Sequence, residues 1–275
     1  MIDLHLHTTA SDGTLTPADL VERAASAGLT VISVTDHDTV AGLPEAHAAA
    51  AARGIRLIDG VEITAVEGAR DVHMLAYFFD PATPSLVDFL DAQRADRVRR
   101  VEDMAARLKA LGAPVDCARL LETAAREAGK SVGRPQVADA LVAAGFAVDR
   151  DDAFDRLLGD DGPAYVPRRG ATPGEVIALV AKAGGIVSLA HPGLLRKDAI
   201  IPRLASEGLA AIEVRHSDHD AEDERRYREL AGTLGIAVSG GSDYHGDAAH
   251  RTAAIGGVTL PPEDFAHLEA RRPRW

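Results

Sequence analysis

The amino terminus carries histidine and aspartate at spacings that suit a metal site. Apolar and polar residues alternate over residues 2–7, which is the period of a strand with one buried face. His5 and His7 are two positions apart, so their imidazoles point the same way, and Asp12 follows in a turn. Imidazole and carboxylate are ligands for divalent metals. This stretch predicts part of a metal site, although an ordinary edge strand would show the same alternation.

Similar polar clusters accompany each later segment that has the character of a strand. We expect these strands at residues 30–34, 55–58, 72–77, 185–190, 210–214 and 237–240. Most clusters stand at or just past the strand end, and one histidine lies inside its strand. Their members are His37, Glu62, His73, His191, His216, Asp243 and His245. Helices with recognisable start and stop signals separate most of the strands, which predicts a parallel α/β fold.

In closed α/β barrels the carboxyl ends of the strands build the active site. We therefore expect nine side chains to converge there: His5, His7, Asp12, His37, Glu62, His73, His191, Asp243 and His245. Nine nitrogen and oxygen ligands exceed the needs of one tetrahedral ion, so they suit two or three divalent ions with open positions for water and substrate. The mixture of imidazole and carboxylate without thiolate favours Mn, Fe or Zn.

The alternation of strands and helices stops near residue 80. A break at residues 80–84 precedes a long helical pattern over 86–111, and shorter helices are expected at 117–128, 134–144 and 151–158. No segment from 85 to 165 has the pattern of a strand, so we predict an all-helical insert. The arginines at 94, 97, 99 and 100 are interpreted as a solvated helical face, with a track for a short oligonucleotide as the alternative.

Composition narrows the class of protein. The formal net charge of −12 disfavours broad binding to duplex nucleic acid, which needs a basic face. The single cysteine, Cys117, allows no intrachain disulfide and no cysteine-based zinc cluster. The sequence shows neither a signal-peptide pattern nor an apolar run long enough to span a membrane, so we expect a soluble cytoplasmic protein without a membrane partner.

The ordered motifs resemble those of the PHP (polymerase and histidinol phosphatase) family of metal-dependent phosphoesterases. The matching stretches begin at Asp3, Ser11, Thr35, Gly60, Ala190 and Gly241, and span nearly the whole chain. The resemblance implies a distorted (β/α)7 barrel with a trinuclear metal centre. The barrel would comprise residues 1–80 and 166–275, and the helical insert, residues 81–165, would cover the active site.

The resemblance also implies a division of the ligands. His5, His7, Glu62 and Asp243 would hold one ion. Glu62, His73 and His191 would hold a second, with Glu62 bridging. Asp12, His37 and His245 would hold a third.

The insert, with Gly133, Arg134 and Pro135 within it, resembles the branch of nucleoside 3′,5′-bisphosphate phosphatases and 5′-3′ exoribonucleases, although Gln136 stands where that branch often has histidine. We therefore expect hydrolysis of the 3′-phosphate of such a nucleotide, or action on the 5′ end of a short RNA. The hypothesis is that a water between two ions loses a proton and attacks phosphorus in line. Arg134, Arg168 and His216 are the candidate phosphate contacts, and His216 is also the candidate proton donor.

Several alternatives stay open at this level. Histidinol phosphate is the runner-up substrate, and an amidohydrolase that splits a C–N bond is a rival enzyme class. A regulatory metal module is a third possibility, but all nine ligands are retained. Arg134 and Arg168 could each be solvated charges, and His219 could be either functional or structural. Three further histidines, His47, His250 and His267, are expected on the surface.

Overall fold

The computed structural model describes residues 1–246 and 254–273. Seven strands form one sheet in the order in which they occur along the chain. Their bounds are β1 (Ile2–Leu6), β2 (Val31–Val34), β3 (Arg56–Glu67), β4 (Arg70–Tyr77), β5 (Ile186–Leu189), β6 (Ala211–Arg215) and β7 (Ala237–Gly240). An isolated parallel bridge between Leu6 and Tyr244 links β1 to the segment after β7. The sheet is therefore a nearly closed barrel, and the predicted α/β barrel of seven strands is confirmed.

The expectation of an all-parallel sheet is wrong for one strand. β4 runs antiparallel to both β3 and β5, while the other neighbouring pairs are parallel. The reason is local, because β3 continues to Glu67 and Gly68 turns it directly into β4 without an intervening helix. Two site residues are affected. Glu62 lies within the long strand rather than past its end. His73 lies in the first half of β4, and because β4 is antiparallel to β3, this half lies at the same end of the barrel as the carboxyl ends of the parallel strands.

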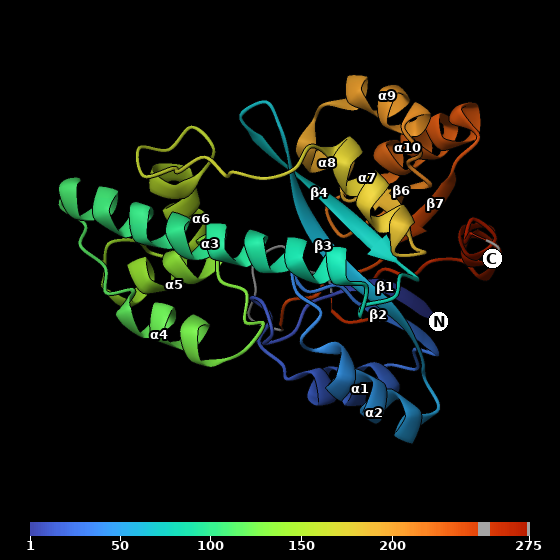
Figure 1. The fold of residues 1–275 in the computed structure, drawn as a ribbon, viewed down its shortest axis with the longest axis horizontal. Coiled ribbons are helices and arrows are strands. Elements are labelled where there is room, and N and C mark those ends of the chain that lie inside the picture. Colours follow the sequence, from blue (N-terminus) through green and yellow to red (C-terminus); the bar gives the residue numbers. More distant parts are fainter. Residues whose placement is uncertain (247–253, 274–275) are drawn as a thin grey trace.

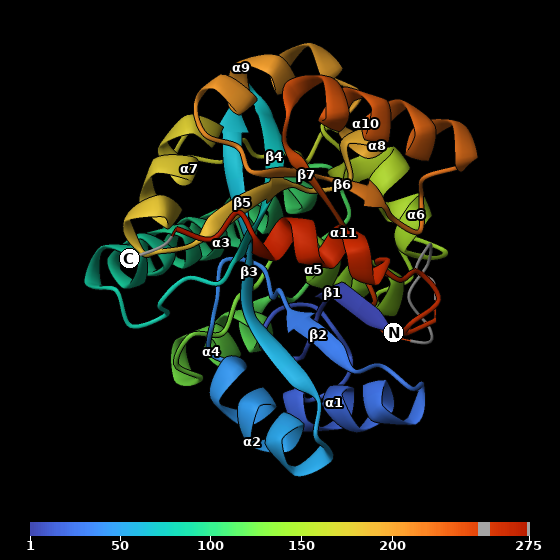
Figure 2. The ribbon, with the colours of Figure 1, turned by 90° about the vertical axis from the view of Figure 1, so that its right-hand side faces the viewer.

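Helices cover the barrel from opposite sides (Figure 1). α1 (Pro17–Ser26) and α2 (Leu43–Arg53) lie on one side, and α7 (Pro173–Lys182), α8 (Pro192–Leu195), α9 (Ile201–Ser206) and α10 (Ala221–Leu234) lie on the other. α11 (Pro262–Glu269) packs against β7 near the middle of the view in Figure 2. A capping box begins α7, because the Thr172 hydroxyl accepts from Glu175 N–H and the Glu175 carboxylate accepts from Thr172 N–H.

A second group of helices extends away from the barrel (Figure 1). It contains α3 (Pro84–Ala110), α4 (Ala118–Arg126), α5 (Arg134–Ala143), α6 (Arg150–Ala153) and a π-helical turn (Phe154–Leu158). Residues 85–165 contain no strand, as predicted. Leu86 and Leu90 at the start of α3 pack into the barrel core, whereas Val101 and Met104 belong to a separate core within the helical group. α3 thus joins the two parts. Among the described residues, no helix is both long and apolar enough to cross a bilayer.

Candidate active site

Four side chains from three parts of the chain meet at the carboxyl end of β1. His5 Nε2 lies 3.2 Å from Glu62 Oε2 and from Asp243 Oδ1, and His7 Nε2 lies 3.2 and 3.1 Å from the same two oxygens. The edges of a tetrahedron around an ion with bonds of about 2.0 Å are roughly 3.3 Å long. These four atoms therefore have the mutual spacing of ligands around one metal ion.

Glu62 is the centre of the histidine cluster. Its Oε1 lies 2.7 Å from His73 Nδ1 and 3.1 Å from His191 Nε2, whereas its Oε2 faces His5 and His7. A carboxylate with different neighbours at its two oxygens can bridge two ions. The position of Glu62 follows from its place inside β3, since His73 stands on the adjacent antiparallel strand.

A further group gathers around Asp12, in the loop after β1. Asp12 Oδ1 lies 3.4 Å from His245 Nε2, and Asp12 Oδ2 lies 3.6 Å from His37 Nε2. His7 Nδ1 is 3.7 Å from Asp12 as well. His37 stands between this group and Glu62, because its Nδ1 is 3.2 Å from Glu62 Oε2. All nine side chains of the predicted set are thus brought together. Eight of them fall in groups whose ligand atoms are close enough to hold an ion, and His191 joins them through its contact with Glu62.

Unpartnered atoms test whether metal ions fit these residues. Both ring nitrogens of His7, Nδ1 of His37 and of His73, and Oδ1 of Asp243 are buried and lack a hydrogen-bond partner among the described residues. Leaving buried polar atoms unpaired costs about 1–3 kcal/mol each. Imidazole nitrogen and carboxylate oxygen are suitable donors for divalent ions, so a metal would satisfy the atoms that the protein leaves without partners.

Electrostatics favours cations at the same place. Burial raises the pKa of Glu62, but the surrounding histidines, led by His37, outweigh burial and hold it well below the usual range. Burial likewise lowers the pKa of His7, but the nearby carboxylates of Asp243 and Glu62 raise it to about 10. The carboxylates are therefore ionised and attract positive charge, which bound metal ions would supply.

Three further carboxylates hold the ligand-bearing segments in place, and sequence reasoning did not assign them these roles. Glu213 on β6 accepts from His5 Nδ1–H at 2.9 Å and from His191 N–H at 2.8 Å. Asp3 accepts from the Ser242 N–H and hydroxyl at 2.9 and 2.7 Å. Asp36 accepts from the N–H and hydroxyl of Thr8 and from the Ser11 hydroxyl. The available signal for Glu213 was a carboxylate inside an otherwise apolar, buried strand.

The backbone at the rim is bent to present the ligands. His191 and Asp243 have positive φ angles of 25° and 53°, which side-chain-bearing residues rarely adopt. Strain of this kind persists where the surrounding structure fixes it, and it concentrates at functional sites. Next to Asp243, a Cβ on Gly241 would collide with the backbone nitrogen of His5. A glycine is needed there to let the segment after β7 pass close to β1.

A cavity of about 180 Å³, which we call the arginine cavity, is lined by candidate ligands and by four arginines. Its walls include Asp12, Thr64, Asp71, Pro135 and Phe154, the ligands His37 and His73, and the arginines Arg97, Arg100, Arg134 and Arg168. The interpretation of the arginines on α3 as a solvated face is therefore wrong for Arg97 and Arg100, which are only 7% and 4% exposed. They share a helix face with buried Gln93 and Met104, a spacing of three to four residues that could have revealed them.

Asp38 organises part of this wall. Its Oδ2 accepts from Arg97 Nε at 2.6 Å and from Arg168 Nη1 at 3.0 Å, and its Oδ1 accepts from Thr64 N–H. Burial raises the pKa of Asp38, but the charges of Arg97 and Arg168 lower it to about 2. Asp36 therefore holds the loop after β1, whereas Asp38 holds two arginines.

The predicted substrate residues occupy different positions. Arg134 lines the arginine cavity and also an adjoining cavity of about 150 Å³, which His191, Leu194 and Leu195 help to form. Arg168 is buried rather than in a solvated turn. The side chain of His216 is fully buried, with Nε2 3.3 Å from Asp243 Oδ2 and with Nδ1 accepting from Asp218 N–H.

Other histidines have structural surroundings. His219 Nδ1–H donates to the Val214 carbonyl, and its Nε2 accepts from Gly193 N–H, so this ring ties β6 to the segment after His191. His47 is half exposed beside Asp59, and His267 is exposed, as expected. His250 lies outside the described residues.

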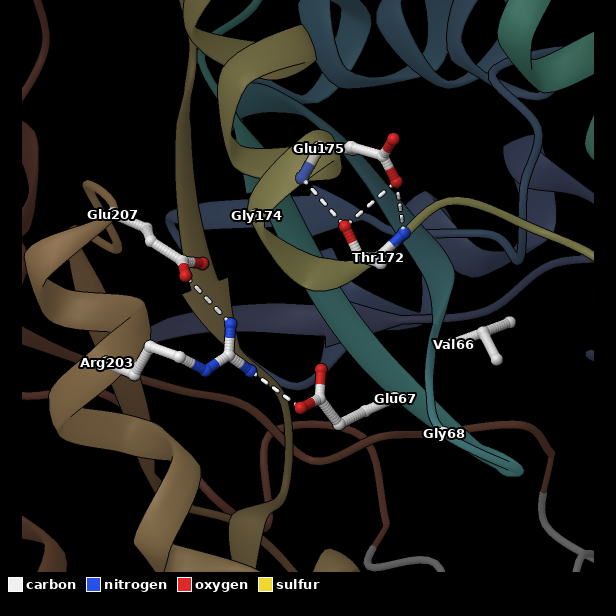
Figure 3. A pocket seen from close by; sticks show the side chains of 8 residues that line it. All are labelled: Val66, Glu67, Gly68, Thr172, Gly174, Glu175, Arg203 and Glu207. Atoms are coloured by element: carbon white, nitrogen blue, oxygen red, sulfur yellow. Dashed lines mark hydrogen bonds and ion pairs between the residues drawn. The ribbon is translucent and has the colours of Figure 1, made fainter.

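A larger hollow, of about 710 Å³, lies on the surface between the β3–β4 turn, the start of α7 and α9 (Figure 3). Its charged groups satisfy one another, because Arg203 pairs with Glu67 and Glu207, and Glu175 caps its own helix at Thr172. None of the candidate metal ligands lines it. This hollow therefore lies apart from the candidate ligands.

Comparison with known proteins shows the family of this chain. The PHP domain model matches residues 3–101. A 3′,5′-nucleoside bisphosphate phosphatase of Chromobacterium violaceum is 36% identical over 253 residues, which cover 89% of this chain and 87% of that protein. The 5′-3′ exoribonuclease Rnm of Salmonella typhimurium is 34% identical over 250 residues, 88% of this chain and 84% of that protein. A phosphoribosyl 1,2-cyclic phosphate 1,2-diphosphodiesterase of Eggerthella lenta is 32% identical over 256 residues, 89% of this chain and 94% of that protein.

Two solved structures share the whole fold. One, from Bifidobacterium adolescentis and described as a metal-dependent phosphoesterase, has a TM-score of 0.89 and 35% identity, with 99% of this chain and 96% of that chain covered. The other, from Chromobacterium violaceum, is described as an amidohydrolase with bound sulfate and no metal. It has a TM-score of 0.86 and 33% identity, with 99% and 97% covered. The chain therefore belongs to the PHP domain family and is a metal-dependent phosphoesterase.

Proposed function

We propose that this enzyme hydrolyses the 3′-phosphate of nucleoside 3′,5′-bisphosphates. The observation that carries the proposal is one cavity that is lined both by candidate metal ligands and by four arginines. A phosphate monoester with a second anionic group suits such a cavity. The similarity to a nucleoside bisphosphate phosphatase over most of both chains supports the same substrate class.

We assign three divalent ions to the ligand groups, with Mn as the first choice and Fe or Zn as alternatives. His5, His7, Glu62 and Asp243 would hold the first ion. Glu62, His73 and His191 would hold the second, and Asp12, His37 and His245 the third. The spacing of the first four ligand atoms and the bridging contacts of Glu62 support this division.

Divalent ions at these positions would neutralise charge on the phosphoryl oxygens and lower the pKa of a water near phosphorus. The protein's own groups position and bind. Glu213 fixes the His5 ring through its Nδ1–H, and Asp3 fixes the segment that carries Asp243. His216 Nε2 lies 3.3 Å from Asp243 Oδ2 and would orient that carboxylate. Arg134 and Arg168 would hold substrate phosphate, since guanidinium offers paired donors at fixed angles.

The helical insert, residues 81–165, would act as the second wall of the site. It supplies Arg97, Arg100, Arg134 and Phe154 to the arginine cavity. The adjoining cavity would receive the base, because Leu194 and Leu195 on its wall can pack against the face of a planar ring while charged side chains line much of the rest. The two cavities share Asp71, His73 and Arg134, so one nucleotide could occupy both.

The 5′ end of a short RNA is the second candidate substrate. The similarity to an exoribonuclease over 88% of this chain favours it. The 5′-terminal phosphate could bind the same arginines while the next phosphodiester of the RNA lies at the metal ligands. The net charge of −12 favours short, single-stranded substrates over a duplex.

A small panel tests the proposal. The enzyme, with its metal content measured, is assayed for phosphate release from a nucleoside 3′,5′-bisphosphate, a nucleoside 5′-monophosphate, histidinol phosphate and a short 5′-phosphorylated RNA. We expect the highest kcat/KM with the bisphosphate and two to three Mn, Fe or Zn per chain. Preference for histidinol phosphate would replace the substrate but keep the chemistry. A fully metallated enzyme that is inactive on the whole panel would refute the proposal.

A further inference from the structure

The loop after β1, residues 8–14, carries the candidate ligand Asp12 and contains neither helix nor strand. A loop of this kind is held largely by the segments that it contacts. Asp36 holds one side, because it accepts from the backbone and hydroxyl of Thr8 and from the hydroxyl of Ser11. The backbone carbonyls of the loop have their partners elsewhere, in the helical insert.

Three consecutive carbonyls of this loop accept hydrogen bonds from the insert. Lys130 Nζ donates to the Thr9 carbonyl and, at 3.2 Å, to the Ser11 carbonyl. Ser131 N–H donates to the Ala10 carbonyl at 2.9 Å. The next residue in the chain is the candidate ligand itself. These bonds therefore fix the backbone immediately before the carboxylate that faces the metal site.

Gln136 makes a further bond to the same loop. Its Nε2 donates to the Ser11 carbonyl at 3.0 Å, and its Oε1 accepts from Gly133 N–H at 2.8 Å. Gln136 is the residue that stands where the branch resembled by this sequence often has histidine. Both polar atoms of its amide are engaged within the protein, and they link the start of α5 to the loop.

The insert also contacts the loop that carries His37. The buried Thr39 hydroxyl donates to the Gly129 carbonyl at 2.6 Å. A Cβ on Gly129 would lie only 2.6 Å from that of Ala41, so the two backbones pass close together. We call residues 129–136 the clamp segment. It contacts both loops that carry a carboxylate or imidazole of the third ligand group.

Ligands of the other two groups are held from within the barrel. Glu213 on β6 bonds the His5 ring and the His191 backbone. Asp3 on β1 bonds the segment that carries Asp243. These contacts involve no residue of the clamp segment. A change in the clamp segment should therefore affect one group of ligands and spare the rest.

We propose that the clamp segment positions the third metal ion, with Lys130 and Gln136 as its positioning residues. The proposal rests on the three ions assigned under the proposed function, and it makes the third ion dependent on the helical insert. Without the clamp segment, Asp12 and His37 would occupy a wider range of positions. Ligands that are not held in place bind metal more weakly, because binding must then order them.

Lys130→Met tests the proposal, since it removes both hydrogen bonds of the ammonium group and keeps an unbranched side chain. Loss of a positive charge beside a cation site would by itself strengthen metal binding. Positioning predicts the opposite result, with binding of one ion weakened about 10-fold or more and binding of the other two unchanged. Gln136→Leu leaves the charge unaltered and should weaken the same ion. The affinities are measured by competition with a chelator of known affinity, with metal analysis counting the ions per chain.

Lys109→Met is the matched control. Lys109 is exposed near the end of α3, so the variant makes the same chemical change within the insert but outside the clamp segment. It should keep all the wild-type affinities. Asp12→Ala identifies which ion belongs to the third group. Thermal unfolding of each metal-free variant checks the fold, and if Lys130→Met does not fold, Gln136→Leu carries the comparison.

The readout is metal binding, so it does not depend on which substrate the enzyme prefers. Weakening confined to the ion that Asp12→Ala removes supports the clamp segment, even if the nucleoside bisphosphate is not hydrolysed and that part of the proposed function fails. Equal affinities in wild type, Lys130→Met and Gln136→Leu, or an equal loss at every ion, would overturn the proposal and leave the substrate untouched. If Asp12→Ala removes no ion, the third site and the role of the clamp segment are both refuted.

Discussion

Replacing Glu213 by glutamine should weaken metal binding although Glu213 itself belongs to none of the three ligand sets proposed above. The Glu213 carboxylate is fully buried and accepts two hydrogen bonds, from His5 Nδ1–H and from the His191 backbone N–H. Glutamine has one acceptor oxygen and an NH₂ donor in nearly the same volume. In the variant, the NH₂ group must therefore face either His5 Nδ1–H or the His191 backbone N–H, and that hydrogen bond is lost.

The magnitude follows from those two contacts. Removing a carboxylate behind a metal-binding histidine typically costs 10–100-fold in metal affinity, or about 1.4–2.8 kcal/mol. The assay is competition with a chelator of known affinity, read by metal analysis, together with kcat/KM for phosphate release. Glu229→Gln, on the exposed face of α10, is the control because it makes the same chemical change far from the ligands. Full metal affinity and full activity in Glu213→Gln would refute the positioning role.

Three further predictions concern other residues of the site. Asp12→Ala and His37→Ala should each lose the metal bound at the third group and most of the activity, and unchanged metal content with unchanged turnover would contradict the third site. Burial raises the pKa of Asp38, but the charges of Arg97 and Arg168 lower it to about 2. Above the pKa of about 4 that this carboxyl has in the unfolded chain, its ionised form therefore stabilises the folded state by about 2 kcal/mol. That contribution should vanish as the pH falls from 4 to 2, so the difference in free energy of unfolding between wild type and Asp38→Asn should shrink over this range. Gly241→Ala should destabilise the protein by about 1–3 kcal/mol, measured by denaturant unfolding, since its Cβ would meet the His5 backbone; an unchanged midpoint would show that the segment after β7 can move away.

The positions of the strands could be predicted because apolar runs and turn signals are local properties of the chain. The nine candidate ligands were predicted for the same reason, since each polar cluster adjoins such a run, and the structure brings all nine together. The direction of β4 could not be predicted by the same rule. It depends on β3 continuing past Ile58 into a hairpin, and the polar Asp59 and Glu62 were interpreted as the end of that strand.

The arginines show the clearest difference between sequence and tertiary structure. By itself the sequence determined which residues can bind metal, because histidine and carboxylate chemistry belongs to the side chain and their clustering is visible along the chain. It did not determine that Arg97 and Arg100 are buried, because a charged residue on a helix is ordinarily solvated. Only packing of the helical insert against the barrel supplies Asp38, Asp71 and the Val166 carbonyl as partners. These partners lie 29 to 66 positions away in sequence, so the cationic lining of the cavity exists only in the folded protein.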